Sequence, residues 1–354
     1  MPVQEGISVS TQSYAVAGLV LSPSQVFSSQ VQDLQRDLRS LGYGKGPIDG
    51  MFGPGTANAV KALQFDLMNN DGSSSQGDGA APVAVKNYNN GSVTALTGVV
   101  DQGLVACIAA MLADAAFPSL PSSSNPAADN QSAIAAVKSL SPAQVPIPFL
   151  MAILMQESDC MHFQVPGGAN SDNYVTIGLD RNNAANPAAI TSRGYGIGQY
   201  TLFHHPPTAD EVAQVIKDPA KNVQQAVSEL RGKFDNFVNG ATPNSQADDR
   251  IAEVGAGALR VCQYQASDAR YLTDCANCLA SATLTNITAG VTPVYAGSQL
   301  TYGQTQYHIG SYQNVPVRAN IPCDWPYAVR RYNGGGVNSY DYQAEVLLRV
   351  VKSA

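Results

Sequence analysis

The sequence predicts a mainly α-helical protein in two parts: a small three-helix N-terminal domain and a larger α+β domain with a small β-hairpin region. Apolar residues recur at helical spacing in residues 31–41 and 59–67, which predicts the first two helices. A nearly continuous apolar run at 148–158 predicts a buried helix, and apolar–polar alternation at 173–180 predicts a strand.

The composition indicates a globular protein and excludes several classes of partner. Of the 354 residues, 44% are hydrophobic and 13% are charged, which is enough apolar material for two packed cores. A net charge of -7 argues against non-specific binding to nucleic acid or to anionic membranes. No stretch reaches the roughly 18 to 20 apolar residues that span a bilayer. Residues 1–24 lack the basic start of an ordinary signal peptide.

The first domain is expected over residues 25–116, after a flexible or strand-like lead-in at 1–24. Ser29 and Gln32 are spaced as a capping box for its first helix, and Gly42 is placed to end that helix. Pro54 suits the first turn of the second helix, where its missing N–H costs nothing. The apolar faces of the two helices are formed by Val31, Leu34, Leu38, Leu41, Ala59, Val60, Leu63 and Leu67.

Polar segments interrupt this pattern twice. Residues 69–91 are rich in Gly, Ser, Asn and Asp and are expected to form a surface insertion, after which residues 97–115 return to a helical pattern. Residues 117–132 contain several Pro, Ser and Asn residues and are expected to form a linker. The second domain is then expected over residues 133–354.

The link between the first two helices carries a recognisable set of motifs. These are Leu41-Gly42-Tyr43, Pro47-Ile48-Asp49-Gly50 and Phe52-Gly53-Pro54-x-Thr56. Together they resemble the peptidoglycan-binding domain of the three-helix type. Gly50 and Gly53 allow a sharp turn, and Asp49 can accept bonds from backbone N–H groups within it. The resemblance implies that Tyr43, Asp49, Phe52 and Thr56 belong to a wall-binding module and that peptidoglycan is the partner.

Three segments of the second domain carry candidate chemistry. Glu157 follows the apolar run 148–158, where partial desolvation would favour the protonated form that glycosidic cleavage requires. Gln199 follows three alternating glycines and offers both a donor and an acceptor to a sugar. Tyr332 and Asn333 precede a glycine run; Tyr332 can place a phenol near the acid, and Asn333 can anchor a loop. Each segment alone is also typical of a plain helix end or a tight turn.

Taken in order, these segments resemble glycoside hydrolase family 23, the lytic transglycosylases and goose-type lysozymes. Glu157-Ser158, Gly196-Ile197-Gly198-Gln199 and Tyr332-Asn333-Gly334 stand in the positions of the family's motifs, while Arg331 replaces the usual Ala and Gly198 a frequent Met. The resemblance implies a lysozyme-like domain with Glu157 as the catalytic acid. It implies a substrate-binding set of Ser158, Gly198, Gln199, Tyr200, Tyr332 and Asn333. The segment 173–180 is also similar to the hairpin of phage-type lysozymes, so a phage-type lysozyme is a second enzymatic interpretation.

The expected reaction is cleavage of the MurNAc–GlcNAc β-1,4 bond in peptidoglycan. Attack by the sugar's own C6 hydroxyl needs only Glu157, so a lytic transglycosylase is favoured. Attack by water normally needs a second carboxylate, for which Asp172 and Asp180 are the candidates. The remaining alternative is a non-catalytic wall-binding protein with an inactive lysozyme-like fold.

The cysteines bear on where the protein acts. Cys262, Cys275, Cys278 and Cys323 surround a segment poor in large aliphatic residues, which favours at least one disulfide among them. The four histidines form no pair with metal spacing, so neither a metal nor another cofactor is expected. We expect a monomer that acts in the periplasm or cell wall after phage lysis or specialised secretion. An immunity or inhibitor protein stays open as a further partner.

Overall fold

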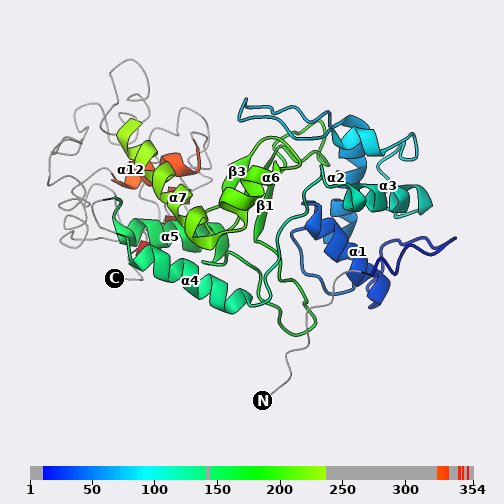
Figure 1. Cartoon of the computed structure of the whole chain (residues 1–354), viewed down its shortest axis with the longest axis horizontal. Helices are drawn as coiled ribbons and strands as arrows, with labels where there is room; N and C mark the ends of the chain where they lie inside the picture. Colours follow the sequence, from blue (N-terminus) through cyan, green and yellow to red (C-terminus); the bar gives the residue numbers. More distant parts are fainter. Residues whose placement is uncertain are drawn as a thin grey trace, which may run out of the picture. The chain divides into compact units, whose positions relative to one another are not determined.

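The structure is a computed structural model that describes residues 11–140, 144–236 and 325–334, together with positions 342, 343, 345, 346, 349 and 350. Within these residues the fold is mainly α-helical, with one three-stranded sheet (Figure 1). This confirms the predicted mainly α fold with a small β-hairpin region. The chain divides into two compact units, Met1–Ala133 with Met161–Asn222, and Ile134–Cys160 with Val223–Ala354.

Three helices open the first unit: α1 (Ser29–Ser40), α2 (Pro54–Asn69) and α3 (Gln102–Ala113). As predicted, Pro54 lies in the first turn of α2, and Gly42 follows the end of α1 with a φ of +82°. The predicted capping box of Ser29 and Gln32 is wrong: the N-cap is Ser28, and Val31 stands at the position where a box needs Glu or Gln. Ser28 has the extended backbone of an N-cap, and its hydroxyl accepts from the Val31 N–H at 3.5 Å. Gln32 donates instead to the Ile48 carbonyl at 3.4 Å.

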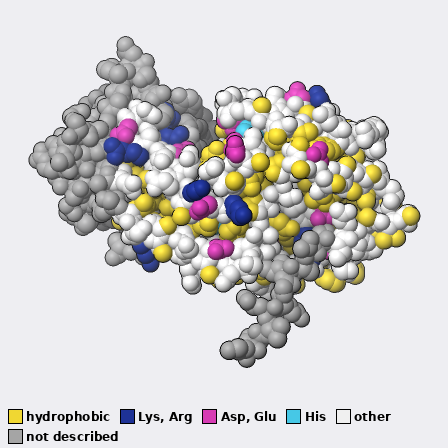
Figure 2. All heavy atoms as spheres, in the orientation of Figure 1, with side chains coloured by type: hydrophobic (Ala, Val, Ile, Leu, Met, Phe, Trp, Pro, Cys, Tyr) yellow, Lys and Arg dark blue, Asp and Glu magenta, His cyan; other side chains and the backbone are white. Residues whose placement is uncertain are grey.

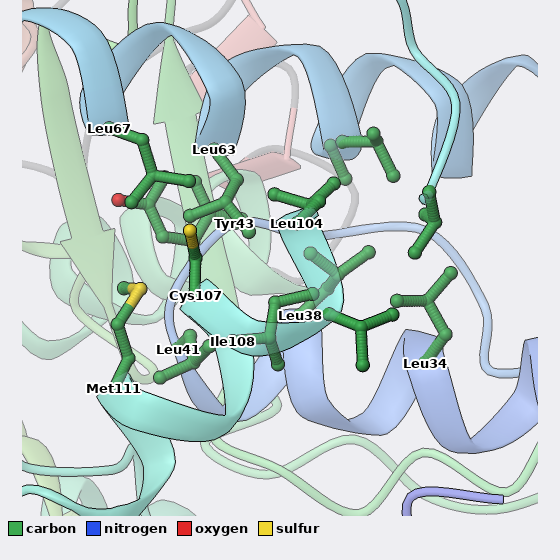
Figure 3. Packing of buried hydrophobic residues seen from close by; sticks show 14 of the residues in the cluster. Leu34, Leu38, Leu41, Tyr43, Leu63, Leu67, Leu104, Cys107, Ile108 and Met111 are labelled. Atoms are coloured by element: carbon green, nitrogen blue, oxygen red, sulfur yellow. The ribbon is translucent and has the colours of Figure 1, made fainter. Parts of the chain in front are cut away.

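The apolar faces of the three helices meet in one core (Figure 3). Leu34, Leu38 and Leu63 are fully or almost fully buried, as the helical spacing predicted. Burying a leucine side chain contributes roughly 1.5–3 kcal/mol, so this face accounts for much of the module's stability. The other labelled members of the cluster are Leu41, Tyr43, Leu67, Leu104, Cys107, Ile108 and Met111.

Two largely exposed segments of the first unit are anchored to its helices at individual points. The expected surface insertion at 69–91 contains a short 3-10 helix, η1 (Val85–Tyr88), whose Val85 is fully buried in the core. In the lead-in, Leu21 pairs with Val100 through two backbone hydrogen bonds of 3.0 and 2.9 Å. Apolar residues within each segment therefore anchor it to the helices.

The small sheet also belongs to the first unit. Its strands β1 (Ile177–Asp180), β2 (Ser192–Tyr195) and β3 (Tyr200–Leu202) are antiparallel in the order β1-β2-β3. Only the second half of the predicted strand at 173–180 forms β1. A short helix α6 (Ala209–Glu211) and a π-helical turn η2 (Val212–Ile216) follow. A second core forms here from Leu120, Phe163, Val175, Ile177, Leu179, Tyr195, Leu202 and Ile216.

The expected linker at 117–132 is packed rather than extended. Phe117 and Leu120 are buried, the Leu120 N–H donates to the Ser40 carbonyl at 2.7 Å, and α4 (Pro126–Lys138) begins inside the segment. The compact units consequently divide the chain at other positions than the expected domains. The sheet region, expected in the domain 133–354, shares a unit with α1, α2 and α3.

The second unit is built from helices. They are α5 (Ile147–Ser158), α7 (Pro219–Phe234), which enters this unit at Val223, and α12 (Trp325–Tyr332). Phe234 stacks on Trp325 with the ring centroids 3.9 Å apart. The buried apolar side chains of the second unit include Phe149, Leu150, Ile153, Leu154, Val227, Leu230, Ala328 and Val329. This packing confirms that the apolar run at 148–158 forms a largely buried helix.

Candidate functional site

A groove in the first unit lies between α1 and α2, beside the link that carries the wall-binding motifs. It is a shallow, open groove lined by Gln35, Arg39, Gly46, Pro47, Thr56 and Ala59, among others. The Gln35 amide donates to the Asp49 carboxylate and to the Thr56 hydroxyl, each at 3.0 Å. Asp49 also accepts from the Met51 N–H at 2.9 Å, the turn-forming role expected of it. The turn therefore fixes the polar side of the groove.

The four predicted wall-binding residues have different roles in the structure. Thr56 lines the groove, and Asp49 shapes its turn. Tyr43 and Phe52 are each 0% exposed, which makes them core residues that a ligand cannot touch. On the face shown in Figure 2, charged side chains of the described residues are few and scattered.

The sheet is joined to this module by a buried ion pair. Arg193 of β2 lies 3.0 Å from the Asp66 carboxylate of α2 and also donates to the Gly42 carbonyl at 3.1 Å. The Tyr43 hydroxyl donates to the same carboxylate at 2.9 Å. Burial raises the pKa of Asp66, and Arg193 opposes that shift. The arrangement leaves each buried charge compensated, as low-dielectric surroundings require.

The glycine-rich turn after β2 holds Gln199 against the sheet. Gln199 has a φ of +51° and donates its amide to the Gly196 carbonyl at 2.8 Å. Gly178 and Gly194 are cross-strand partners, and a Cβ on either would come within 2.3 or 2.6 Å of the Gln199 amide oxygen. The glycine pair therefore makes room for Gln199, a reason for these glycines that spacing alone did not reveal.

Two buried polar side chains support this turn. His162 accepts from the Ile197 N–H through Nδ1 at 3.3 Å, so Nε2 carries the proton that bonds the Ile216 carbonyl at 2.9 Å. Burial lowers the pKa of His162 to about 4. Asn222 accepts from the Gly198 N–H at 2.8 Å. Sequence reasoning missed both residues because neither lies near the turn in the chain.

Glu157 lies in the last turn of α5 in the second unit and is half-buried. The Tyr342 hydroxyl donates to its Oε1 at 2.6 Å. Burial and the neighbouring Glu157 raise the pKa of Tyr342 well above its usual value, so this phenol stays protonated at neutral pH. The acid candidate thus has a defined hydrogen-bond donor from the tyrosine-rich segment that follows the third motif.

Tyr332 and an unpredicted carboxylate share these surroundings. Burial, then Glu229, then Glu157 raise the pKa of Tyr332 well above its usual value. Glu229 lies on α7, half-buried, with its carboxylate 3.6 Å from the Lys233 ammonium. Burial raises the pKa of Glu229, and Lys233 opposes that shift. Because Glu229 belongs to no recognised motif, the sequence alone did not single it out.

The candidate second carboxylates belong to the first unit, whereas Glu157 belongs to the second. Asp172 is 1% exposed and lies 2.6 Å from the Arg39 guanidinium. Asp180 is exposed at the end of β1 and accepts from the Ser192 hydroxyl at 2.8 Å. Asp172 therefore forms a buried ion pair in the structure.

The remaining predicted residues are also divided between the units. Ser158 is buried and donates back to the Leu154 carbonyl at 3.0 Å, and Asn333 is exposed after α12. Gly198, Gln199 and Tyr200 belong to the first unit. Cys107 and Cys160 are buried free thiols. The other four cysteines, with the predicted disulfide, lie outside the described residues.

Comparison with known proteins bears on the segment that contains α1, the turn around Asp49 and α2. Residues 28–67 match the family model of a putative peptidoglycan binding domain. This match supports peptidoglycan as a partner of the module and suggests association with the cell wall. No curated protein and no solved structure matches the chain. Within the described residues, no helix is long and apolar enough to cross a membrane.

Proposed function

We propose that this protein binds peptidoglycan through its N-terminal module and cleaves the glycan strand with Glu157 as general acid. The hydrogen bond from Tyr342 to Glu157 is the observation that carries the catalytic half of the proposal. It joins the helix-end acid to the segment following the tyrosine motif, as a composite site requires. The family match at residues 28–67 supports the binding half. The proposed place of action is the periplasm or cell wall.

The favoured chemistry is lytic transglycosylation in a lysozyme-like domain. Glu157 gives its proton to the oxygen that links MurNAc C1 to GlcNAc C4, and the C1–O bond breaks. The C6 hydroxyl of the same MurNAc then forms a bond to C1 and returns its proton to Glu157. The products are a GlcNAc end and a 1,6-anhydro ring, with no water consumed. One carboxylate serves as acid and then as base.

Replacement of the acid tests this proposal. Glu157→Gln keeps the side-chain shape but has no proton to donate, so fragment release should fall by about 10² to 10⁴. Glu345→Gln, which alters another half-buried carboxylate of the second unit, is the matched control and should stay near wild type. Purified sacculi are the substrate, and mass spectrometry identifies the chain ends. Wild-type activity in Glu157→Gln would overturn the catalytic assignment.

Hydrolysis is a second candidate reaction, and the presence of Glu229 supports it. This carboxylate shares the second unit with Glu157, and both raise the pKa of Tyr332. In hydrolysis, Glu229 would serve as the second carboxylate, which activates the attacking water. Hydrolysis would produce reducing MurNAc ends, and Glu229→Gln would then lose activity together with Glu157→Gln. Anhydro ends with activity retained in Glu229→Gln would support transglycosylation.

Wall binding without catalysis is the remaining alternative, since residues 28–67 are the segment that matches a family. Sacculus co-sedimentation separates this case from the others. Wild-type protein that sediments with sacculi, yet releases no fragments, would establish a binding protein.

A further inference from the structure

A second cleft lies in the first unit, separate from the groove of the wall-binding module. The cleft is open to solvent, and its empty space, counted with the solvent at its mouth, is about 740 Å³. One side comes from the end of α2 and the start of the insertion, and the other from residues around β2 and β3 (α2 and β3 are labelled in Figure 1). Both sides belong to the same compact unit. The cleft is therefore a feature of one packed body.

Buried interactions hold the two sides of the cleft together. Arg193 and Asp66 form the ion pair of 3.0 Å that joins β2 to α2, and both line the cleft. From the insertion, Asp78 accepts from the Phe203 N–H at 2.7 Å. His204, between Asp78 and Glu211, lies 3.5 and 3.0 Å from their carboxylates. The insertion is thus fixed as one wall of the cleft.

The charges of the cleft exclude an anionic ligand. Arg193 is neutralised by Asp66, and His204 faces two carboxylates. Burial and the nearby Arg193 hold the pKa of His205 well below its usual range, so that imidazole is uncharged. Asp71 adds a negative charge at the exposed rim. No lining residue offers an uncompensated positive charge to a phosphate or carboxylate.

The accessible lining groups suit a neutral, polar ligand with apolar faces. Amide and hydroxyl side chains are contributed by Asn69, Asn70, Ser73, Ser75 and Thr191. The half-exposed Phe65, Ile190 and Phe203 add apolar contact area. Amides and hydroxyls can both donate to and accept from sugar hydroxyls and acetamides. Aromatic and aliphatic side chains can pack against the ring carbons.

We propose that this cleft is a binding site for neutral N-acetylated aminosugars, so that the chain holds glycan at a place distinct from Glu157 and from the module groove. The choice of sugar rests on the proposed association with peptidoglycan. A glycan held here would add a second contact to the wall, and linked contacts raise the overall affinity.

The test uses the full-length chain, a tetramer of β-1,4-linked GlcNAc and ¹³C-methyl NMR of isoleucine. The Ile190 methyl group, assigned with Ile190→Val, reports on the cleft itself. We expect a saturable shift with a dissociation constant of about 1 mM or tighter. Ser75→Trp, which fills the cleft, should weaken binding at least about tenfold. Gln76→Trp, exposed beside it outside the lining residues, should bind as wild type.

The outcomes separate this site from the proposed function. An Ile190 methyl that does not respond, responds equally in Ser75→Trp, or responds equally to the cellulose tetramer without acetamides would overturn the proposal. If the site fails while sacculi are still bound and cut, the proposed function stands alone. If Ile190 responds but sacculi are neither bound nor cut, the sugar site stands and the proposed function fails.

Discussion

At the scale of single residues, the phenol of Tyr342 is the contact that gives Glu157 a fixed orientation. Its hydroxyl lies 2.6 Å from the carboxylate, and Tyr342 is 8% exposed, so water cannot readily replace it. Removal of a hydrogen bond to a charged group costs roughly 1.5–3 kcal/mol. Tyr342 is therefore expected to position Glu157 rather than to touch the substrate.

Tyr342→Phe should reduce the rate of fragment release by about tenfold to a hundredfold, because the carboxylate loses its donor. The alkaline limb of the pH profile should also move to higher pH, which a merely structural defect would not cause: Glu157 must be protonated to act as the acid, and loss of a donor to its carboxylate raises its pKa. Tyr88→Phe is the control, since it removes a similar 2.9 Å bond from a phenol to Asp114 in the first unit. Unchanged activity and an unchanged pH profile in Tyr342→Phe would contradict this role.

Local chemistry made some of these residues predictable and left others hidden. The acid at the end of an apolar helix and the tyrosine segment follow from residue type and order in the chain. Glu229, His162 and Asn222 could not be found in this way, since each acts on residues far away in sequence. Their surroundings, and hence their pKa values and partners, exist only after folding.

At the scale of elements, the glycine-rich turn depends on an uncharged His162. Burial holds its folded pKa at about 4, against 6.5 for an ordinary histidine. Between these values the unfolded chain binds more protons than the folded one, so stability rises with pH. The contribution is complete above about pH 6.5 and is lost as the pH falls toward 4; its size is about 3 kcal/mol.

Urea unfolding of wild type and His162→Gln between about pH 4.5 and 7 measures this contribution. The variant has no group that titrates at this position, so its free energy of unfolding should vary less with pH than that of wild type. His205, whose pKa is also lowered by burial, should supply the slope that remains. Identical slopes for the two proteins would show that His162 does not titrate as the structure indicates.

The ion pair between β2 and α2 leads to a prediction about a linked set of variants. Arg193→Met leaves the Asp66 carboxylate buried without its cation, which should cost about 3–5 kcal/mol of unfolding free energy. Adding Asp66→Leu and Tyr43→Phe removes the stranded polar groups, so the triple variant should regain most of the loss. Chemical denaturation measures both. A triple variant less stable than Arg193→Met would show that the ion pair itself is strongly stabilising.

At the scale of the whole molecule, several of the helices were predictable and the division into units was not. Helical periodicity is a local signal, and it placed α1, α2 and α5 within a residue or two. The expected linker and insertion were inferred from polar composition. Composition does not show that Phe117 and Leu120 are buried or that Asp78 is bonded to residues far along the chain. The segments that composition predicts as a linker and an insertion are therefore parts of a packed unit.

This difference reverses an expectation about truncation. If 117–132 were a free linker, removal of residues 1–125 would leave a folded enzyme domain. In the structure, that deletion removes Arg39 and Asp66, the partners of Asp172 and Arg193. Each stranded buried charge costs about 3–5 kcal/mol, and a domain has only about 5–15 kcal/mol of stability in total. The fragment should therefore fail to form its sheet region.

We predict that the fragment 126–354 alone lacks a cooperative thermal transition and is cut rapidly by protease within 161–222. Co-expression of residues 1–125 as a separate chain is the control, because it returns Arg39 and Asp66 to their partners. It should restore both protease resistance and a cooperative transition, followed by circular dichroism. An isolated fragment that melts cooperatively at the wild-type temperature and releases wall fragments at the wild-type rate would show that the sheet region folds independently of the module.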